Sequence, residues 1–261
     1  MNPIASPRSI LITGASSGLG AALARHYAAS GAHLVLVGRH EGRLAEVAAD
    51  CRRLGGSTEI RSADVVDTRA MSDLIAAADR AIPLDLVIAN AGVSAGTLGG
   101  PESSEQVRRI FAINVDGVVN TVQPAIEAMR ARGRGQIALV SSLAGFRGFP
   151  GAPTYCASKA AIKVWGEALR GSLHGEGIAV SVVCPGYVET AMTAKNDFWM
   201  PLMMSAEKAA GIIARGLARN RARIAFPWPL HSAVTLIAML PPGLLDPLMR
   251  KLPAKAAAID E

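Results

Sequence analysis

A tyrosine, a lysine and a serine stand at spacings that would let them move a proton. Tyr155 and Lys159 are four residues apart in a helical pattern, so they share one helix face, and Ser142 ends a predicted strand before them. A free tyrosine has a pKa of about 10 and is a poor base near neutral pH. A nearby ammonium favours the phenolate, which would make the pair a working acid and base. The structural alternative is a half-buried helix face with a lysine whose charged end reaches solvent.

The segment after the first predicted strand suits a phosphate group. It contains three glycines and two serines, Gly14, Ser16, Ser17, Gly18 and Gly20. Glycines permit close backbone approach to a ligand, and the N-terminus of the following helix offers free N–H groups and a positive dipole end. We predict a dinucleotide site here, against the alternative of a simple turn.

The end of the second predicted strand carries Arg39 where an acidic residue would bind the adenosine ribose hydroxyls. An acid would repel a 2′-phosphate, whereas Arg39 can pair with it through charge-assisted hydrogen bonds. The sequence therefore favours a cofactor with a 2′-phosphate. The alternative is an ordinary solvated loop arginine.

Three further strand ends carry residues that suit a flat ligand. Asp64 follows the third strand, where an adenine contact and helix capping are both open. Asn90 follows the fourth strand and can hold its loop together. Pro185 and Gly186 redirect the chain after the sixth strand, either as a plain turn or as a backbone shelf for the far end of the cofactor.

Alternating apolar strands and amphipathic helices must position these residues. The predicted strands are Ser9–Thr13, Ala32–Val37, Thr58–Ala63, Leu84–Ala89, Gln136–Ser141, Ala179–Cys184 and Arg223–Phe226. The predicted helices are Gly18–Ser30, Glu41–Leu54, Met71–Ala81, Ser103–Arg132 (with Gln106 in a capping box), Thr154–Gly175 and Ser205–Arg219. This order predicts a single α/β domain over 1–261, a doubly wound Rossmann-type fold whose seven-stranded parallel sheet carries helices on both faces. Ligands bind beyond the carboxyl ends of such strands, where every cluster above lies.

Composition excludes several other classes of protein. The 261 residues are 50% apolar, which excludes a disordered or collagen-like chain. Three scattered cysteines and five histidines without ligand spacing predict neither a disulfide framework nor a metal site. The charge of +6 is dispersed among acids, so nucleic-acid binding is not favoured. Neither a secretion signal nor a run of about 18 apolar residues is evident, which predicts a cytoplasmic protein.

Together, these motifs resemble the short-chain dehydrogenase/reductase family over about residues 8–226. The resemblance implies a nicotinamide cofactor and hydride transfer between a hydroxyl and a carbonyl. It implies that Tyr155 is the general acid and base, that Lys159 lowers its pKa and binds the nicotinamide ribose, and that Ser142 binds the substrate oxygen. Asn114 would link Lys159 to a water relay. A sensor or scaffold that binds a dinucleotide without chemistry is the alternative function.

The resemblance also implies a set of cofactor contacts. Besides Tyr155 and Lys159, they are Gly14, Ser16, Ser17, Gly18, Leu19 and Gly20 at the pyrophosphate, Asp64 and Val65 at adenine, Asn90 at adenosine, Pro185 and Gly186 as the shelf, and Val188 and Thr190 at the carboxamide. Arg39 implies NADP, with NAD less favoured. Ser17 stands where many NADP-dependent members carry a basic residue.

The substrate and the assembly are less defined by the sequence. Segments 94–96 and 143–154 and a methionine-rich lid over 191–204 would wall the pocket, which suggests that the small-molecule substrate is an apolar or bulky carbonyl compound. The long helices over 103–132 and 154–175 would form a subunit interface in a homo-oligomer, expected as a dimer.

The tail over 227–252 departs from the usual pattern because it continues as apolar residues after the seventh strand. A cover over the substrate pocket, a subunit interface and a peripheral membrane anchor compete as interpretations. We expect burial against protein, with the first tail helix beside 192–204.

Overall fold

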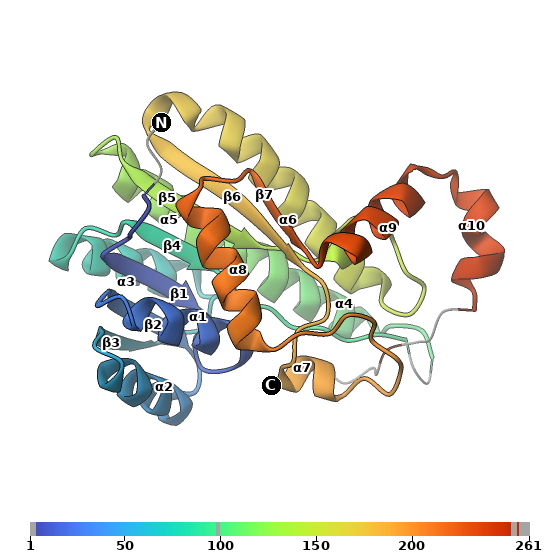
Figure 1. Cartoon of the computed structure of the whole chain (residues 1–261), viewed down its shortest axis with the longest axis horizontal. Coiled ribbons are helices and arrows are strands. Elements are labelled where there is room, and N and C mark those ends of the chain that lie inside the picture. Colours follow the sequence, from blue (N-terminus) through green and yellow to red (C-terminus); the bar gives the residue numbers. More distant parts are fainter. Residues whose placement is uncertain (1–3, 98–99, 252–254, 256–261) are drawn as a thin grey trace.

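The sheet orders seven parallel strands around the first. The computed structural model describes residues 4–97, 100–251 and 255. Its strands run in the order β3-β2-β1-β4-β5-β6-β7, all parallel (Figure 1). Their bounds are β1 (Ser9–Thr13), β2 (His33–Gly38), β3 (Ser57–Ser62), β4 (Leu86–Ala89), β5 (Gly135–Val140), β6 (Ile178–Pro185) and β7 (Arg223–Phe226). The predicted fold class is confirmed. The order reverses between β1 and β4, the point at which such sheets bind ligands.

Helices cover both faces of the sheet because successive strand side chains point to opposite sides. Ile10 and Ile12 are fully buried against one face, and Leu11 between them is fully buried against the other. The first face holds α1 (Gly18–Ala28), α2 (Glu41–Arg53) and α8 (Ala206–Ala218). The second holds α3 (Thr68–Ala81), α4 (Ser104–Phe111), α5 (Gly117–Arg130) and α6 (Pro153–Ser172). Continuous apolar runs such as that of β1 follow from this double coverage.

The long helix predicted over Ser103–Arg132 is interrupted. Between α4 and α5 the chain forms a five-residue π-helical segment, η1 (Ala112–Asp116). The predicted capping box is half wrong: Ser103 accepts from the Gln106 backbone, but the Gln106 side chain donates to the Gly96 carbonyl at 3.0 Å. Gln106 is buried, so its amide satisfies a buried carbonyl in preference to the helix end.

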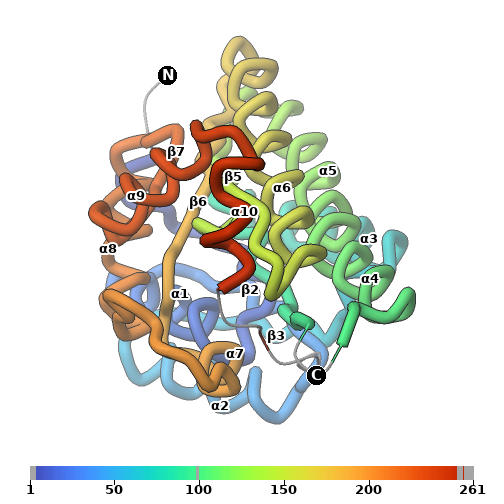
Figure 2. Tube along the Cα trace, turned by 90° about the vertical axis from the view of Figure 1, so that its right-hand side faces the viewer, coloured from blue at the N-terminus to red at the C-terminus, as the bar shows by residue number. Residues whose placement is uncertain are grey.

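Two short helices follow β7 and project from one end of the molecule (Figures 1 and 2). They are α9 (Trp228–Met239) and α10 (Pro242–Met249). Val234 of α9 is buried with Leu143 and Cys184, in a small cluster that includes no described residue of 191–204. Within the described part of the chain, no helix is long and apolar enough to cross a membrane.

The tail helices leave much apolar surface uncovered within one chain. Leu245 and Met249 of α10 are buried, but Leu244 remains 72% exposed and Met239 of α9 remains 77% exposed. The predicted burial is therefore only partly achieved by this chain itself. Part of the predicted lid is also open, because Trp199 is 84% exposed, although Met204 at its end is buried.

Candidate functional site

The ends of β4, β5 and β6 bring the predicted acid–base residues together. Ser142 is the residue before the short 3-10 turn η2 (Leu143–Gly145), and Tyr155 lies in the first turn of α6. The Ser142 hydroxyl accepts from the Ala144 amide at 3.1 Å and is also a polar neighbour of the Tyr155 phenol. Burial raises the pKa of Tyr155 to about 12, and the neighbouring Ser142 hydroxyl opposes that rise. The phenol therefore keeps its proton at neutral pH.

Lys159 is held against the sheet one turn further along α6. Its ammonium donates to the Val140 carbonyl at 3.0 Å and stands 5.9 Å from the centre of the Tyr155 ring. Only 4% of Lys159 is exposed, and burial lowers its pKa to about 8. The sequence predicted that Lys159 would lower the pKa of Tyr155. In the structure burial dominates both groups, raising the tyrosine pKa and lowering the lysine pKa.

Asn114 sits in the π-helical segment, whose widened turn aims its side chain inward. Its Nδ2 donates to the Val93 carbonyl at 2.9 Å and to the Ser158 hydroxyl at 3.0 Å, and its Oδ1 accepts from the Val93 amide. A Cβ placed on Gly92 would lie 3.2 Å from both Asn114 Oδ1 and Lys159 Nζ. Asn114 thus ties the β4 loop to α6 and faces Lys159 across Gly92.

The glycine-rich turn forms a cradle that side chains would fill. Gly14 has φ +65° and a Cβ there would lie 2.9 Å from Ala91 Cα. Gly18 has φ +52° and abuts Thr190, while a Cβ on Gly20 would lie 2.2 Å from the Gly14 carbonyl oxygen. Each glycine is therefore required by conformation or by close approach.

The N-terminus of α1 is open toward that cradle. Ser17 occupies the N-cap position without a side-chain cap bond, and the first helical turn carries no acid. The Asn90 amide donates to the Thr13 and Gly14 carbonyls at 3.0 and 3.3 Å, which fixes the turn beside β4. An uncapped helix N-terminus behind a glycine cradle fits the pyrophosphate of a dinucleotide.

The remaining predicted contacts surround this turn. Arg39 is exposed at the end of β2. Asp64 accepts from the Val66 amide at 3.1 Å in the loop after β3, and Val65 is buried against Gly117. Asp67, not Asp64, caps α3, so the capping interpretation of Asp64 is wrong.

The loop after β6 contacts the glycine-rich turn. The Pro185 carbonyl accepts from Ser142 at 3.4 Å, and the Gly186 amide donates to the Phe226 carbonyl at 2.7 Å. Val188 is buried and forms a bridge with Met204. Thr190 and Thr193 form a capping box at α7 (Ala191–Ala194), with the Thr190 methyl against Gly18. Ser16 lies near Gly38 of β2, and Leu19 packs on the core.

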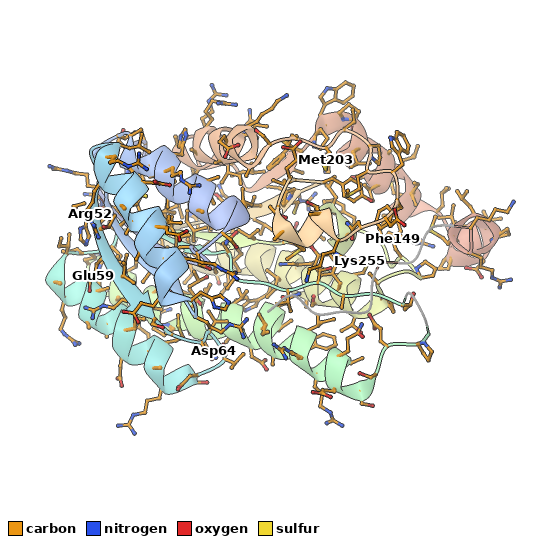
Figure 3. The ribbon with its side chains drawn as sticks, turned by 90° about the horizontal axis from the view of Figure 1, so that it is seen from below. Arg52, Glu59, Asp64, Phe149, Met203 and Lys255 are labelled. Atoms are coloured by element: carbon orange, nitrogen blue, oxygen red, sulfur yellow. The ribbon has the colours of Figure 1, made fainter. Side chains whose placement is uncertain are left out.

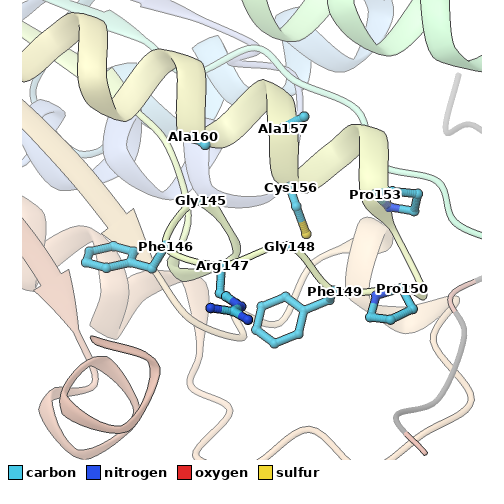
Figure 4. A pocket seen from close by; sticks show the side chains of 10 residues that line it. All are labelled: Gly145, Phe146, Arg147, Gly148, Phe149, Pro150, Pro153, Cys156, Ala157 and Ala160. Carbon is cyan, nitrogen blue, oxygen red and sulfur yellow. The ribbon is translucent and has the colours of Figure 1, made fainter. Parts of the chain in front are cut away.

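A pocket of about 380 Å³ lies between the 145–150 loop and the flank of α6 (Figure 4). Phe149 and Cys156 face each other across it, and Arg147 donates to the Leu240 carbonyl of the tail. Its lining includes none of Ser142, Tyr155 and Lys159, so the predicted wall 143–154 borders a space beside the acid–base group.

Sequence reasoning missed two residues of the site. Ser158 accepts from Asn114, and only its position one residue before Lys159 hinted at this. The Lys255 ammonium lies 5.6 Å from the centre of the Tyr155 ring. The two residues are far apart along the chain, so no local motif signals that contact. No group of three or more histidine, cysteine or acidic residues able to hold a metal occurs among the residues that the structure covers.

Comparison with known proteins places this sequence in a family. A family model described as short chain dehydrogenase matches residues 8–200. The chain belongs to the short-chain dehydrogenase family. It is 38% identical to an uncharacterized oxidoreductase of Myxococcus xanthus over 248 residues, covering 95% of this chain and 98% of that protein. It is 35% identical to a ketoacyl reductase of Nostoc sp., covering 78% of this chain and 70% of that one.

Solved structures of the family agree. A variant of actinorhodin polyketide ketoreductase with NADPH matches with a TM-score of 0.78 at 25% identity, covering 88% of this chain and 99% of that chain. This short-chain dehydrogenase is therefore a nicotinamide dinucleotide-dependent oxidoreductase that acts on CH–OH and C=O groups. The bound dinucleotide supplies or accepts the hydride.

Proposed function

We propose that this short-chain dehydrogenase uses NADP to transfer a hydride between the nicotinamide and a carbonyl or secondary alcohol of a largely apolar small molecule. The observation that carries the proposal is the buried ammonium of Lys159, which donates to the Val140 carbonyl at 3.0 Å and lies 5.9 Å from the centre of the Tyr155 ring, with Ser142 as a polar neighbour of the phenol. These groups could hold a carbonyl oxygen and deliver a proton to it while a hydride reaches the carbon.

Each side chain has a separate task in this proposal. Tyr155, whose pKa is about 12, donates its proton to the developing alkoxide, which suits the reductive direction at neutral pH. Ser142 orients the substrate oxygen with its hydroxyl. Lys159 contributes positive charge behind Tyr155 and contacts the nicotinamide ribose. Asn114 fixes the β4 loop at Val93 and so keeps Lys159 in place.

The preference for NADP rests on Arg39. Its guanidinium is exposed at the end of β2, the strand end at which Rossmann-type folds bind the adenosine ribose. The actinorhodin ketoreductase similar to this chain carries NADPH. Exposed arginine forms bidentate bonds with a phosphate dianion, so the 2′-phosphate of NADP would be bound rather than repelled.

Titration with NADPH and NADH tests this preference. We expect tighter binding of NADPH, and Arg39→Ala should weaken NADPH binding about tenfold or more while leaving NADH binding unchanged. Arg43→Ala is the matched control, because Arg43 is an exposed arginine in the first turn of α2. Equal dissociation constants of the wild-type protein for the two cofactors would remove the NADP assignment without touching the family assignment.

We also propose a homo-oligomer that pairs α6 with its copy. The exposed side of α6 carries small apolar residues four, three and four positions apart, namely Ala157, Ala161, Val164 and Ala168. Val164 is 59% exposed in the isolated chain. Small side chains let two helices approach closely. Sedimentation should show a dimer or tetramer that Val164→Glu dissociates; a monomeric wild-type protein would contradict this.

The reaction itself is tested by following NADPH absorbance with a panel of ketones, aldehydes and diketones. We expect reduction of at least one apolar carbonyl compound. If no carbonyl substrate oxidises NADPH or NADH and no alcohol reduces NADP or NAD, the proposed reaction fails.

A further inference from the structure

A lysine from the end of the chain reaches the wall of the acid–base site. Lys255 donates its backbone amide to the Gly151 carbonyl at 3.2 Å, beside the amide of Thr97, which donates to the same carbonyl at 3.1 Å. A Cβ on Gly96 would lie 2.5 Å from Lys255 Cβ and 2.3 Å from the Gly151 oxygen. Only glycine at position 96 leaves room for the Lys255 backbone. Lys255 therefore occupies a notch between the loops that carry Gly96 and Gly151, both in the predicted substrate wall.

The ammonium of Lys255 points from this notch toward the reacting groups. Its Nζ donates to the Ser94 hydroxyl at 2.7 Å and lies 5.6 Å from the centre of the Tyr155 ring. Ser94 is only 1% exposed, which makes it a fixed anchor for the ammonium. In Figure 3, Lys255 lies toward the same end of the molecule as Phe149 and Met203.

Two ammonium groups therefore flank one phenol. Lys159 stands 5.9 Å from the Tyr155 ring centre and is held by a sheet carbonyl, whereas Lys255 stands 5.6 Å away and is held by a loop hydroxyl. At the start of α6, the Glu102 carboxylate accepts from the backbone and the hydroxyl of Thr154. Lys159 serves the cofactor side in the proposed function, whereas Lys255 is held by the loops at Gly96 and Gly151, which belong to the predicted substrate wall.

We propose that Lys255 determines substrate specificity by binding an anionic group, a carboxylate or a phosphate, on the carbonyl compound reduced at Tyr155. This inference rests on the proposed function and narrows its substrate class to oxo acids and their phosphate analogues. Charge-assisted hydrogen bonds to an ammonium are about twice as strong as neutral ones. Apolar side chains toward the same end of the molecule, such as Phe149, would take the rest of the molecule, which makes the substrate amphiphilic.

The experiment compares oxo acids with their own methyl esters, which keep the carbonyl and remove the charge. With 2-, 3- and 4-oxo acids of increasing chain length, the wild-type enzyme should show a higher kcat/KM for the acid of at least one pair. Lys255→Met should lower kcat/KM for that acid about ten- to a hundredfold and change the ester less than about twofold. Lys255→Arg should retain most of the preference. Lys251→Met, an exposed lysine at the end of α10, is the control and should behave as wild type.

A binding measurement makes the test independent of turnover. Calorimetry with saturating NADP compares the Tyr155→Phe enzyme with the double variant that also carries Lys255→Met. At least one oxo acid should bind the double variant at least tenfold more weakly. If no acid binds, or if acid and ester bind equally, the inference is overturned. If Lys255→Met raises kcat/KM for acid and ester alike, residue 255 is an obstacle rather than a ligand, which also overturns it. Failure of the proposed function itself looks different, because then no carbonyl compound, charged or neutral, would oxidise the cofactor.

Discussion

The glycine-rich turn after β1 and the tail after β7 are built on opposite principles. In the turn, Gly20 lies so close to the Gly14 carbonyl that a single added carbon would clash. The Asn90 side chain also donates to the Thr13 and Gly14 carbonyls. In the tail, nothing lies within 4 Å of a Cβ on Gly243, and Leu244 beside it is 72% exposed. The turn is thus determined by contacts within this chain. The tail has fewer such contacts, namely the buried residues Val234, Leu245 and Met249 and the bond from Arg147 to the Leu240 carbonyl.

The sharpest way to break this comparison is to add the same methyl group in both regions. Gly20→Ala should lower the free energy of unfolding by about 3 kcal/mol and weaken NADP binding at least tenfold, because the Cβ would displace the Gly14 backbone. Gly243→Ala, inside α10, should raise stability by up to about 1 kcal/mol because alanine favours helix. Urea unfolding and cofactor titration measure both. If Gly20→Ala and Gly243→Ala changed the free energy of unfolding equally, the turn would not be more tightly packed than the tail.

Lys159 adds a second difference between the site and the tail, because burying its ammonium destabilises the folded state. Burial lowers its pKa from 10.5 to about 8, so below pH 8 the fold contains an ammonium that the unfolded chain solvates better. In the protein without cofactor, Lys159→Met should therefore raise the free energy of unfolding by about 2 kcal/mol at pH 7, about 3 from the relieved charge less about 1 for the lost bond to Val140.

That gain must fall with pH if the pKa shift causes it. It should decline between pH 8, where folded Lys159 loses its proton, and pH 10.5, where the unfolded side chain loses its own. Urea unfolding at pH 7 and pH 10 measures the difference. Lys208→Met, an exposed lysine of α8, should stay within about 0.5 kcal/mol at both values. A gain for Lys159→Met that does not change with pH would exclude the charge as its cause.

The smallest effect is expected in the tail. Leu248→Asp, at a position 53% exposed on α10, should change the free energy of unfolding by less than about 0.5 kcal/mol, whereas Val234→Asp on α9 removes a buried contact and should cost several times more. Thermal and urea unfolding at several protein concentrations measure both. A large loss for Leu248→Asp that depends on concentration would show that a second subunit covers the exposed tail face.

The sequence predicted the parts of the site that local patterns encode. Strand ends, the glycine turn and the four-residue spacing of Tyr155 and Lys159 all depend on neighbours along the chain, so their positions in the fold could be expected from periodicity. The π-helical segment around Asn114 could not, because its insertion depends on the tertiary bonds to Val93 and Ser158. Lys255 could not either, since only the folded chain brings it to Ser94.

The pKa of Tyr155 shows a second limit of sequence reasoning. The spacing to Lys159 correctly indicated that the two groups are neighbours, but it does not report how deeply they are buried. Burial acts on the phenol more strongly than its neighbours do, so the direction of the shift followed from packing. The same packing keeps the proton on Tyr155, where a reductive step needs it.

One measurement tests the central claim that Tyr155 transfers the proton of a nicotinamide-dependent carbonyl reduction. Tyr155→Phe removes one hydroxyl and leaves the ring, so single-turnover reduction of a confirmed substrate by bound NADPH should slow by on the order of a thousandfold. The dissociation constant for NADPH should stay within about twofold of wild type, because the glycine cradle and Arg39 are untouched. Wild-type turnover in Tyr155→Phe would contradict the account.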